Sequence, residues 1–566
     1  AMLIATNSGI YRSTNYRDQN AEAVTFTRAG QPHAQVHMPQ VECSRSVAQH
    51  CVAGSILGTA MVSRDAGSTW TPATGFPAVP PNARSGMRIE LAMSAANPTI
   101  VYASVDRNLG ELYRSDDGGQ TFTLRSTGAN WLGSIRNGVP NSQGWYANAI
   151  WAGDPTRPDL VVVGGLDIFR SLDGGRTFTW IADWTISPRS PHADHHVLAA
   201  HPGYNGTTNR TIYNGNDGGI YRHDNIIVAE PTRGWILLNT NYGVTQFYSV
   251  AGDPKTGRIV GGTQDNGTLA YDPPASGPPA DRFRRIYGGD GSYAAVDPTD
   301  PNFVYGATQF LGLVRSRDGG FATERISEGV FDSGAASGSN FIAPFILDPN
   351  NPNVLFAGGE SLWRTREAKG PRPAWQQVKM AGEGSGNHVS AIEAARSGKA
   401  AGPGSDIVWV GHNMGDLYVS RNASAREPEW TKLDVKGLKL PARAVTRIRV
   451  SSHNPAIVYV SYAGYEKTNL WRTRDDGKSW ENVHGALPEI SVRDVAVHPV
   501  NPRWLYAATH VGLFASADEG VTWTASNRGP ANVAVHQLIW MGERLVAATH
   551  GRGIYEYSFA TQQFVY

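Results

Sequence analysis

The chain has 566 residues, of which 17% are charged, and its acidic and basic side chains balance to a formal net charge of +1 at pH 7. This balance argues against nucleic acid or an anionic membrane as the main partner, and the sequence contains no apolar run of about 18 residues that could insert into a membrane. The 63 glycines, 16 Trp and 22 Tyr are typical of an all-β protein with many tight turns.

The first distinctive residues along the chain are the two cysteines, Cys43 and Cys51. They are either two buried free thiols or a disulfide that closes a small loop, and their spacing fits no structural zinc pattern. We expect the disulfide, which implies an oxidising compartment. With it we expect a secreted protein, extracellular or periplasmic, whose signal peptide is not part of this sequence.

A short turn motif is repeated six times, with the pattern Ser/Thr-x-Asp-x-Gly, usually closing on Trp or Phe. Each copy follows a strand-like run such as Ile-Tyr-Arg and precedes another short apolar run. Asp caps local backbone N–H groups in such turns and Gly takes the positive-φ position. The copies begin at Ser63, Ser115, Ser171, Ser316, Thr473 and Ser516.

Weaker copies of the strand before this turn bring the number of repeats to twelve, spaced by roughly 50 residues, which is the spacing of β-propeller blades. Each complete repeat predicts four strands, A to D. Propellers normally hold four to eight blades, so twelve blades favour two rings, divided 6 + 6 or 5 + 7, over one large ring. We place the first propeller in residues 1–245 and the second in 246–566.

The strand order of a blade determines which loops carry function. The A–B and C–D turns lie on one face, and the B–C and D–A loops lie on the other, around the mouth of the channel. The repeated aspartates all occupy C–D turns, so we interpret them as structural. Ligand sites are concave and built from loops, so the B–C and D–A loops are the place to look for function.

One D–A loop is rich in histidine. His192, Asp194 and His196 could hold a divalent metal ion. The alternative is that one histidine packs or hydrogen-bonds to Asp194 and orders the loop, since His195 and His196 point to opposite sides of a regular strand.

Two B–C loops of consecutive blades each carry an aspartate, Asp217 and Asp265. Both sit in good turn sequences and could simply cap their own turns. The functional alternative is a pair of carboxyl groups for glycoside hydrolysis, which requires them about 5–9.5 Å apart across the scissile bond. The substrate-binding candidates on the same face are Trp145, Tyr146, Gln246, Tyr248, Gln264 and Asp290, with the three aromatic residues as sugar-stacking platforms.

The turn motif and the blade pattern resemble the Asp-box, or bacterial neuraminidase repeat, superfamily over nearly the whole chain. The segment Asn216-Asp217-Gly-Gly-Ile-Tyr-Arg resembles a catalytic phrase, Thr-Asp-x-Gly-Gly-x-Tyr-Arg, of the xyloglucanases built from two tandem propellers, with Asn in place of Thr and one residue fewer. Asp265 is our choice for the second aspartate. True sialidases are a poorer match, because no arginine triad with a Tyr/Glu pair is evident.

The resemblance implies a secreted, glycan-active protein, with Asp217 and Asp265 as acid and base in an inverting hydrolysis of a β-linked polysaccharide. We expect no required cofactor, apart from the metal ion considered near His192–His196, and a polysaccharide or glycan as partner. The alternative is a non-catalytic binding or assembly module with a protein partner, as in the sortilins and the photosystem assembly factors, which share the Asp-box.

Overall fold

The computed structural model of the protein describes residues 1–18, 20–29, 36–78, 87–136, 139–274, 283–396, 402–526, 529–559 and 563–565. The chain forms two compact units, residues 1–239 and 240–566. The predicted boundary, at 245/246, lies a few residues further along. None of the described helices is long and apolar enough to cross a membrane.

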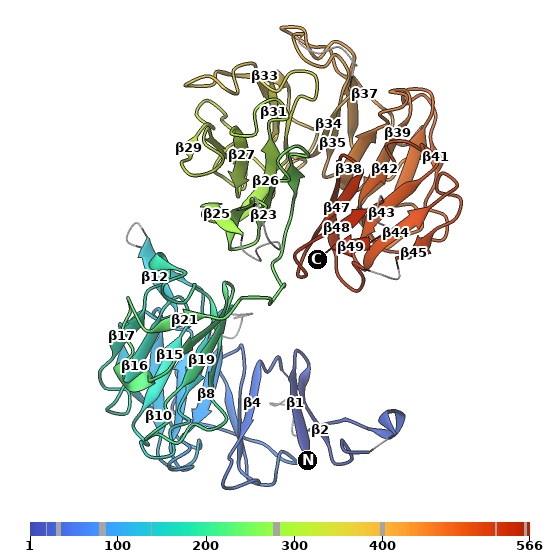
Figure 1. The fold of residues 1–566 in the computed structure, drawn as a ribbon. Helices are drawn as coiled ribbons and strands as arrows, with labels where there is room; N and C mark the ends of the chain where they lie inside the picture. The colour runs from blue at the N-terminus through green and yellow to red at the C-terminus, as the bar shows by residue number, and fades with distance from the viewer. Residues whose placement is uncertain are drawn as a thin grey trace. The chain divides into compact units, whose positions relative to one another are not determined.

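Within its described residues, the first unit contains five antiparallel blades whose strands pair in chain order (Figure 1). A two-stranded hairpin and three short 3₁₀ helices accompany them. The blades are β1 (Met2–Thr6), β2 (Gly9–Ser13) and β3 (Thr27–Arg28); β4 (Gln40–Cys43), β5 (Cys51–Gly54), β6 (Ala60–Ser63) and β7 (Thr71–Pro72); β8 (Ile89–Met93), β9 (Val101–Val105), β10 (Glu111–Ser115) and β11 (Thr123–Thr127); β14 (Ala149–Trp151), β15 (Val161–Gly164), β16 (Ile168–Ser171) and β17 (Thr179–Ala182); β18 (His195–Ala200), β19 (Ile212–Asn216), β20 (Gly219–His223) and β21 (Trp235–Leu237). The hairpin is β12 (Gly133–Arg136) with β13 (Val139–Ser142), and the 3₁₀ helices are η1 (Ala21–Ala23), η3 (Trp184–Ile186) and η4 (Ile226–Val228).

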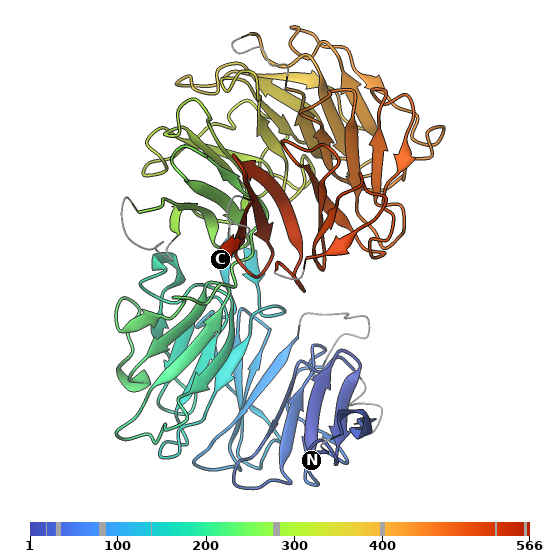
Figure 2. The ribbon, with the colours of Figure 1, turned by 45° about the vertical axis from the view of Figure 1, so that its right-hand side comes forward.

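The second unit contains seven four-stranded antiparallel blades in its described ranges (Figures 1 and 2). They are β22 (Ala251–Gly252), β23 (Ile259–Thr263), β24 (Gly267–Tyr271) and β25 (Arg284–Tyr287); β26 (Gly291–Val296), β27 (Val304–Thr308), β28 (Gly312–Ser316) and β29 (Glu324–Arg325); β30 (Phe345–Leu347), β31 (Leu355–Gly358), β32 (Leu362–Thr365) and β33 (Trp375–Lys379); β34 (Val389–Ala394), β35 (Val408–His412), β36 (Leu417–Ser420) and β37 (Thr431–Lys432); β38 (Val445–Val450), β39 (Val458–Tyr462), β40 (Leu470–Thr473) and β41 (Glu481–Asn482); β42 (Val492–Val497), β43 (Leu505–Thr509), β44 (Gly512–Ser516) and β45 (Thr524–Ala525); β46 (Val535–Met541), β47 (Arg544–Thr549), β48 (Ile554–Ser558) and β49 (Gln563–Val565).

The predicted all-β fold of tandem β-propellers is therefore confirmed, with twelve blades in the described part of the chain, divided five and seven. In each complete blade the third strand is the one marked by the sequence repeat. The strands are short and richly hydrogen-bonded to their neighbours. The residues of the turns between the strands, and not long apolar runs, determine where each strand ends.

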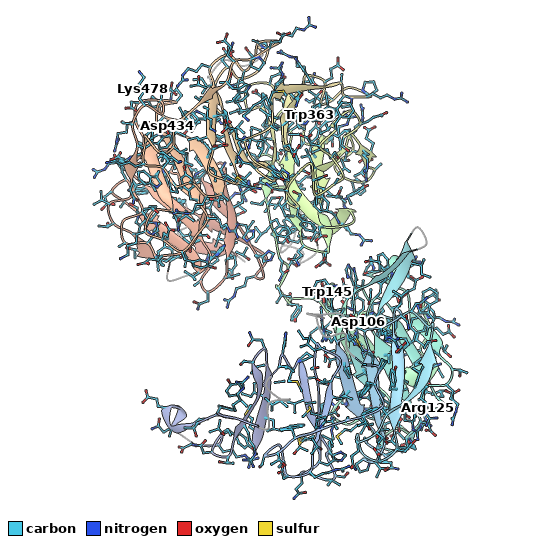
Figure 3. The ribbon with its side chains drawn as sticks, turned by 180° about the vertical axis from the view of Figure 1, so that it is seen from behind. Asp106, Arg125, Trp145, Trp363, Asp434 and Lys478 are labelled. Carbon is cyan, nitrogen blue, oxygen red and sulfur yellow. A yellow bond between two sulfur atoms is a disulfide. The ribbon has the colours of Figure 1, made fainter. Side chains whose placement is uncertain are left out.

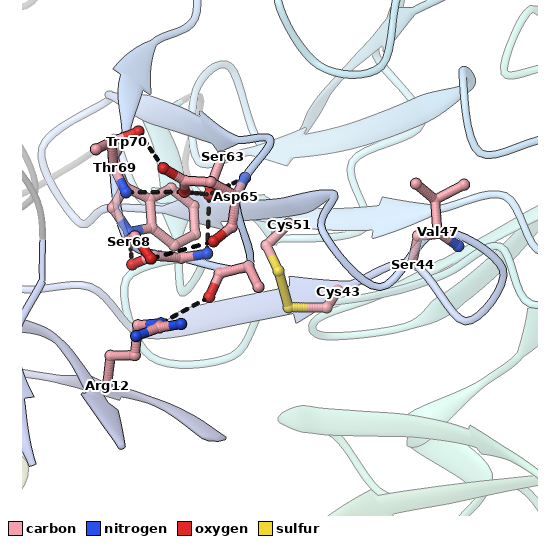
Figure 4. Close-up of a disulfide and its surroundings, with 12 residues drawn as sticks. Arg12, Cys43, Ser44, Val47, Cys51, Ser63, Asp65, Ser68, Thr69 and Trp70 are labelled. Atoms are coloured by element: carbon pink, nitrogen blue, oxygen red, sulfur yellow. Dashed lines mark hydrogen bonds between the residues drawn. A yellow bond between two sulfur atoms is a disulfide. The ribbon is translucent and has the colours of Figure 1, made fainter. Parts of the chain in front are cut away.

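The repeated aspartates form the C–D turns, as predicted. In the first copy the Thr69 amide and hydroxyl donate to the two carboxylate oxygens of Asp65 at 2.8 and 2.7 Å, and the Ser63 hydroxyl donates at 2.8 Å (Figure 4). The hydrogen bonds from Thr69 lower the pKa of Asp65 to about 2. This carboxylate is fully engaged in its turn, on the opposite side of the blade from the B–C loops.

The disulfide between Cys43 and Cys51 is formed, and it joins directly opposed residues of β4 and β5 (Figure 4). The two Cα atoms are 4.0 Å apart. Cys51 is fully buried in a hydrophobic cluster with Ile10 and Trp70, which the first two blades share. The disulfide therefore connects this cluster covalently to the inner strand β4.

Neighbouring blades pack through shared hydrophobic clusters in both units. In the second unit one such cluster also joins the first blade to the seventh, and it contains Phe247, Ile259, Met541 and Val546. The Phe247 amide donates to the Thr549 carbonyl at 2.9 Å across the same junction. The seven blades therefore form a closed ring, and β49 is simply the outer strand of the last blade.

Candidate functional site

The turn that carries Asp217, between β19 and β20, is held by hydrogen bonds of two asparagines. Asn216 accepts a hydrogen bond from the Gly218 amide at 2.9 Å, and Asn239 accepts one from the Ile220 amide at 3.1 Å. Asn239 also donates to the Gly218 carbonyl at 2.7 Å.

The Asp217 carboxylate is held by two side chains from other loops of the first unit. The Tyr146 hydroxyl donates to Oδ2 at 2.9 Å, and His196 Nε2 lies 2.7 Å from Oδ1. The rings of Tyr146 and His196 touch edge to face at 4.8 Å. The Asp217 side chain is 12% exposed, so it is oriented firmly but still reaches solvent.

His196 reaches Asp217 because β18 contains a β-bulge. The pairing of β18 with β19 shifts between His195 and Val197, which leaves His196 as the extra residue. A bulge changes the direction of a side chain and is common beside functional sites. His195, in contrast, is fully buried and hydrogen-bonds through Nδ1 to Asn214 at 2.9 Å. Burial lowers the pKa of His195 to about 3, so it is neutral.

Two exposed aromatic rings adjoin Asp217. Trp145 is 63% exposed and Tyr146 is 39% exposed, and their ring centroids are 5.6 Å apart. Figure 3 labels Trp145 near Asp106, a buried carboxyl group that packs against Gly144. Exposed rings beside a fixed carboxylate suit a sugar, whose apolar faces stack on aromatic side chains.

Arg88 connects this cluster to a carboxyl group that the sequence analysis missed. Its guanidinium donates to the Tyr146 carbonyl at 2.6 Å and forms an ion pair with Glu90 at 2.7 Å. Glu90 is 6% exposed, and burial raises its pKa to about 7, against the opposing charge of Arg88. Burial likewise raises the pKa of Glu42, on the neighbouring inner strand, to about 7.

These groups border a cavity of about 620 Å³ in the first unit, lined by the inner strands β4, β8, β14 and β18. Glu42, Arg88, Glu90 and His196 are among its lining residues. The signal that could have revealed the two glutamates is their place inside otherwise apolar inner strands, Gln40–Cys43 and Ile89–Met93. A carboxyl group at such a position has to be paired, protonated or functional.

The proposed metal ligands do not form a common site. His196 is engaged with Asp217, and His192 Nδ1 lies 3.3 Å from the Ala193 carbonyl. Asp194 adopts a left-handed backbone conformation, with φ at 62°. Throughout the described ranges, no three His, Cys, Asp or Glu side chains are grouped so that they could hold a metal ion.

The remaining candidates lie in the second unit. The Asp265 amide donates to Asp290 Oδ1 at 3.0 Å, and Gln309 donates to Asp290 Oδ2 at 3.3 Å, so Asp290 fastens two loops together. The Tyr248 hydroxyl donates to Gln264 at 3.0 Å. Burial and the nearby carboxylates raise the pKa of Tyr248 to about 12. A shallow pocket of about 540 Å³, lined by Gln309 and the loop glycines, lies in this part of the unit.

Gln246 is exposed and pairs through its backbone with His550. Gln246, Tyr248, Gln264 and Asp290 thus share one region of the second unit with Asp265. Asp217 belongs to the first unit and Asp265 to the second, since the chain divides after Asn239.

The fold defines a tandem β-propeller protein, and comparison with solved structures agrees. The chain is similar to the GH74 xyloglucanase from Xanthomonas campestris, with a TM-score of 0.59, 19% sequence identity, and coverage of 98% of this chain and 80% of that one. A GH74 enzyme from Niastella koreensis aligns at 15% identity, with a TM-score of 0.27, over 92% of this chain and 84% of that one. No protein-family model and no curated protein sequence matches the chain. At this level of identity the similarity concerns the fold.

Proposed function

We propose that this protein is a secreted glycoside hydrolase that acts on a β-linked polysaccharide, with Asp217 as a catalytic carboxylate. The observation that supports this most directly is the orientation of Asp217. Its carboxylate is fixed by Tyr146 and His196, and it lies next to exposed aromatic rings. The similarity of the fold to a xyloglucanase makes a β-linked glycan the substrate class to test first.

Glycoside hydrolysis needs one carboxyl group that keeps its proton near neutral pH and one carboxylate that acts as base or nucleophile. Asp217 accepts hydrogen bonds on both oxygens, which suits the base that activates a water molecule. Glu90, with a pKa of about 7, is a candidate for the acid within the same unit. The pairing of Asp217 with Asp265 as acid and base remains a prediction from the sequence, as does inversion at the anomeric carbon.

Substrate binding is assigned to the aromatic and amide side chains of the two units. Trp145 and Tyr146 would stack on sugar rings beside Asp217. Tyr248, Gln264 and Gln246 would provide a second contact surface, with Asp290 fixing the loop that carries Asp265. The Cys43–Cys51 disulfide supports an oxidising, extracellular or periplasmic location. The two-carboxyl mechanism needs no cofactor, and a divalent ion near His192, Asp194 and His196 is tested by activity in the presence of a chelator.

A non-catalytic glycan- or protein-binding module is the second candidate. It is favoured by the hydrogen bonds within the second unit, where Asp290, Gln309, Tyr248 and Gln264 bind one another and build an ordered rim. Such a rim can bind a partner without any chemistry.

The test is a reducing-end assay of the purified chain against a panel of β-linked polysaccharides. Asp217→Asn should lower kcat at least about 100-fold while leaving the fold intact. Asp224→Asn is the matched control, since Asp224 lies in the same blade, is 64% exposed and, within the described residues, forms an ion pair only with Arg222. Asp265→Asn and Glu90→Gln then show which carboxyl group is the acid.

Equal activity of Asp217→Asn and the unchanged protein would refute the assignment. If no polysaccharide is cleaved, but one is bound and Trp145→Ala weakens that binding, the binding-module function replaces the hydrolase.

A further inference from the structure

A second cluster of charged and aromatic side chains lies on the inner strands of the second unit, in its fifth, sixth and seventh blades. In each of these blades the inner strand is bulged near its start. The pairing shifts between Val445 and Arg447 in β38, between Val492 and Asp494 in β42, and between Val535 and Gln537 in β46. The extra residues are Thr446, Arg493 and His536. A bulge changes the direction of a side chain. In each of these three blades, therefore, the extra residue does not follow the regular alternation of side chains between the two faces of the strand.

Arg493 and three histidines form the centre of this cluster. Arg493 Nε donates to His510 Nε2 at 2.7 Å, which requires His510 to be an acceptor there and therefore neutral. The rings of His536 and His550 stack at 4.8 Å with an interplanar angle of 5°. Burial and the charge of Arg493 lower the pKa of His536 to about 2. Arg493 is thus the single cation of this group, and all four side chains are half-buried.

The arginines beside this group are already neutralised. Arg449 forms a 2.6 Å ion pair with Asp494 and lies 3.7 Å from Glu393. Arg447 lies 3.5 Å from Asp494 and donates to the Tyr293 hydroxyl at 3.3 Å. Two guanidinium groups therefore balance two carboxylates. In the described part of the chain, no Asp or Glu oxygen lies within 4.0 Å of the Arg493 nitrogens.

A half-buried guanidinium without a carboxylate partner is unfavourable by itself, and burial lowers the pKa of Arg493. His550 Nδ1, in the same group, is buried and makes no hydrogen bond within the described residues. The site therefore offers one positive charge without a carboxylate partner, on a side chain that is only half-buried.

We propose that this cluster is a binding site for a single carboxylate, presented by an acidic sugar such as a hexuronate. The planar fork of Arg493 matches a carboxylate with two parallel hydrogen bonds. One net positive charge balances one carboxylate and leaves a phosphate dianion undercompensated. The rings of Tyr248, His536 and His550 pack on one another in this cluster, and their half-buried edges would contact the sugar ring. This site lies in the second unit, next to the Tyr248 surface proposed above for substrate, and it does not depend on Asp217.

Titration calorimetry of the full chain with glucuronate, glucose, inorganic phosphate and sulfate tests the proposal. Glucuronate should bind and glucose should not. Arg493→Gln should weaken glucuronate binding at least 10-fold, and Arg493→Lys, which keeps the charge but loses the fork, should weaken it to a smaller extent. Arg474→Gln is the control, since Arg474 is half exposed and pairs with Glu519 and Glu481 in an outer turn.

The same titration in the Asp217→Asn background separates this site from the hydrolase, because glucuronate binding should persist there. Equal binding of glucuronate by Arg493→Gln and the unchanged protein would overturn the proposal. Binding of phosphate or sulfate without glucuronate would overturn the assignment to a carboxylate. If Arg493→Gln does not fold, the glucuronate affinities of Arg493→Lys and His510→Gln are compared with that of the unchanged protein instead.

Discussion

The two units are built from the same repeat, but they differ in the contact between their first and last blades. In the second unit the first and seventh blades share a core cluster, so every blade has two neighbours. In the first unit each of the five blades packs on the next, but no strand pairing and no hydrophobic cluster of the described residues joins β1–β3 to β18–β21 (Figures 1 and 2). The repeat therefore specifies the blade and its interface with the next blade, while closure depends on additional contacts at the ends.

The difference extends to the inner strands. Those of the first unit border a cavity that contains Glu42 and Glu90, with their raised pKa values. Those of the second unit carry Arg447, Arg449 and Arg493 together with Glu393 and Asp494. One scaffold thus presents buried carboxyl groups in one unit and paired guanidinium and carboxylate groups in the other.

The largest effect is expected where the second ring closes. Phe247 is 1% exposed and lies between the first and seventh blades, so Phe247→Ala should lower the free energy of unfolding of the second unit by about 3–5 kcal/mol. Chemical unfolding monitored by fluorescence measures it. Phe331→Ala, at a position 87% exposed, should change stability by less than about 0.5 kcal/mol. Similar values for both variants would show that closure contributes little.

The first unit should lose stability as the pH rises from about 4.5 to about 7. The Glu90 pKa is raised from its ordinary value of 4.5 to about 7, so the unfolded chain releases this proton first and the folded state binds more protons in that range. The loss is at most about 3 kcal/mol, at 1.36 kcal/mol for each pKa unit. Unfolding curves at several pH values measure it, and Glu90→Gln should flatten the dependence. An unchanged slope in that variant would assign the dependence to other groups.

Much of this architecture is readable from the sequence, and the reasons are local. The repeated turns, such as Ser63–Trp70, specify strand ends by hydrogen bonds within a few residues, so six blades could be located from them, and the strand that precedes the turn located the others. The cluster around Asp217 was partly predictable, because Tyr146 and His196 were both placed on the face of the B–C and D–A loops. Glu90 was missed because it lies within an apolar strand. The bulges at His196, Arg493 and His536 have no sequence signature, because they arise from the pairing of two strands.

The disulfide should matter for the first unit alone. Replacing Cys43 and Cys51 together by Ala should lower its free energy of unfolding by about 2–3 kcal/mol, because the bond closes a short loop in the unfolded chain. Urea unfolding with and without reductant measures the effect on the unchanged protein. Thiol titration of the unreduced native protein should find no free cysteine. Two titratable thiols would contradict the pairing.

The smallest effects are expected in the outer turns, where the two units should behave alike. Asp65 in the first unit and Asp475 in the second make the same contacts, each accepting from the amide four residues later at 2.8 Å and from a Ser or Thr hydroxyl two residues earlier at 2.8 Å. Hydrogen bonds lower the pKa of each to about 2. Their contribution is therefore present above about pH 4 and is lost as the pH falls toward 2.

Asp65→Asn and Asp475→Asn should each lower the stability of their own unit by about 1 kcal/mol, since Asn keeps an acceptor but loses the charge. Activity and glucuronate binding should remain unchanged, because these turns lie on the far side of the blades from the B–C loops. The difference in unfolding free energy between the unchanged protein and each variant, measured at pH 7 and at pH 2.5, gives the charge-dependent part, which should be smaller at pH 2.5 in both units because that pH lies close to the folded-state pKa of about 2. If only one of the two units lost stability, the contribution of the turn would depend on whether the ring is closed. The stability of a blade would then not be determined by the blade alone.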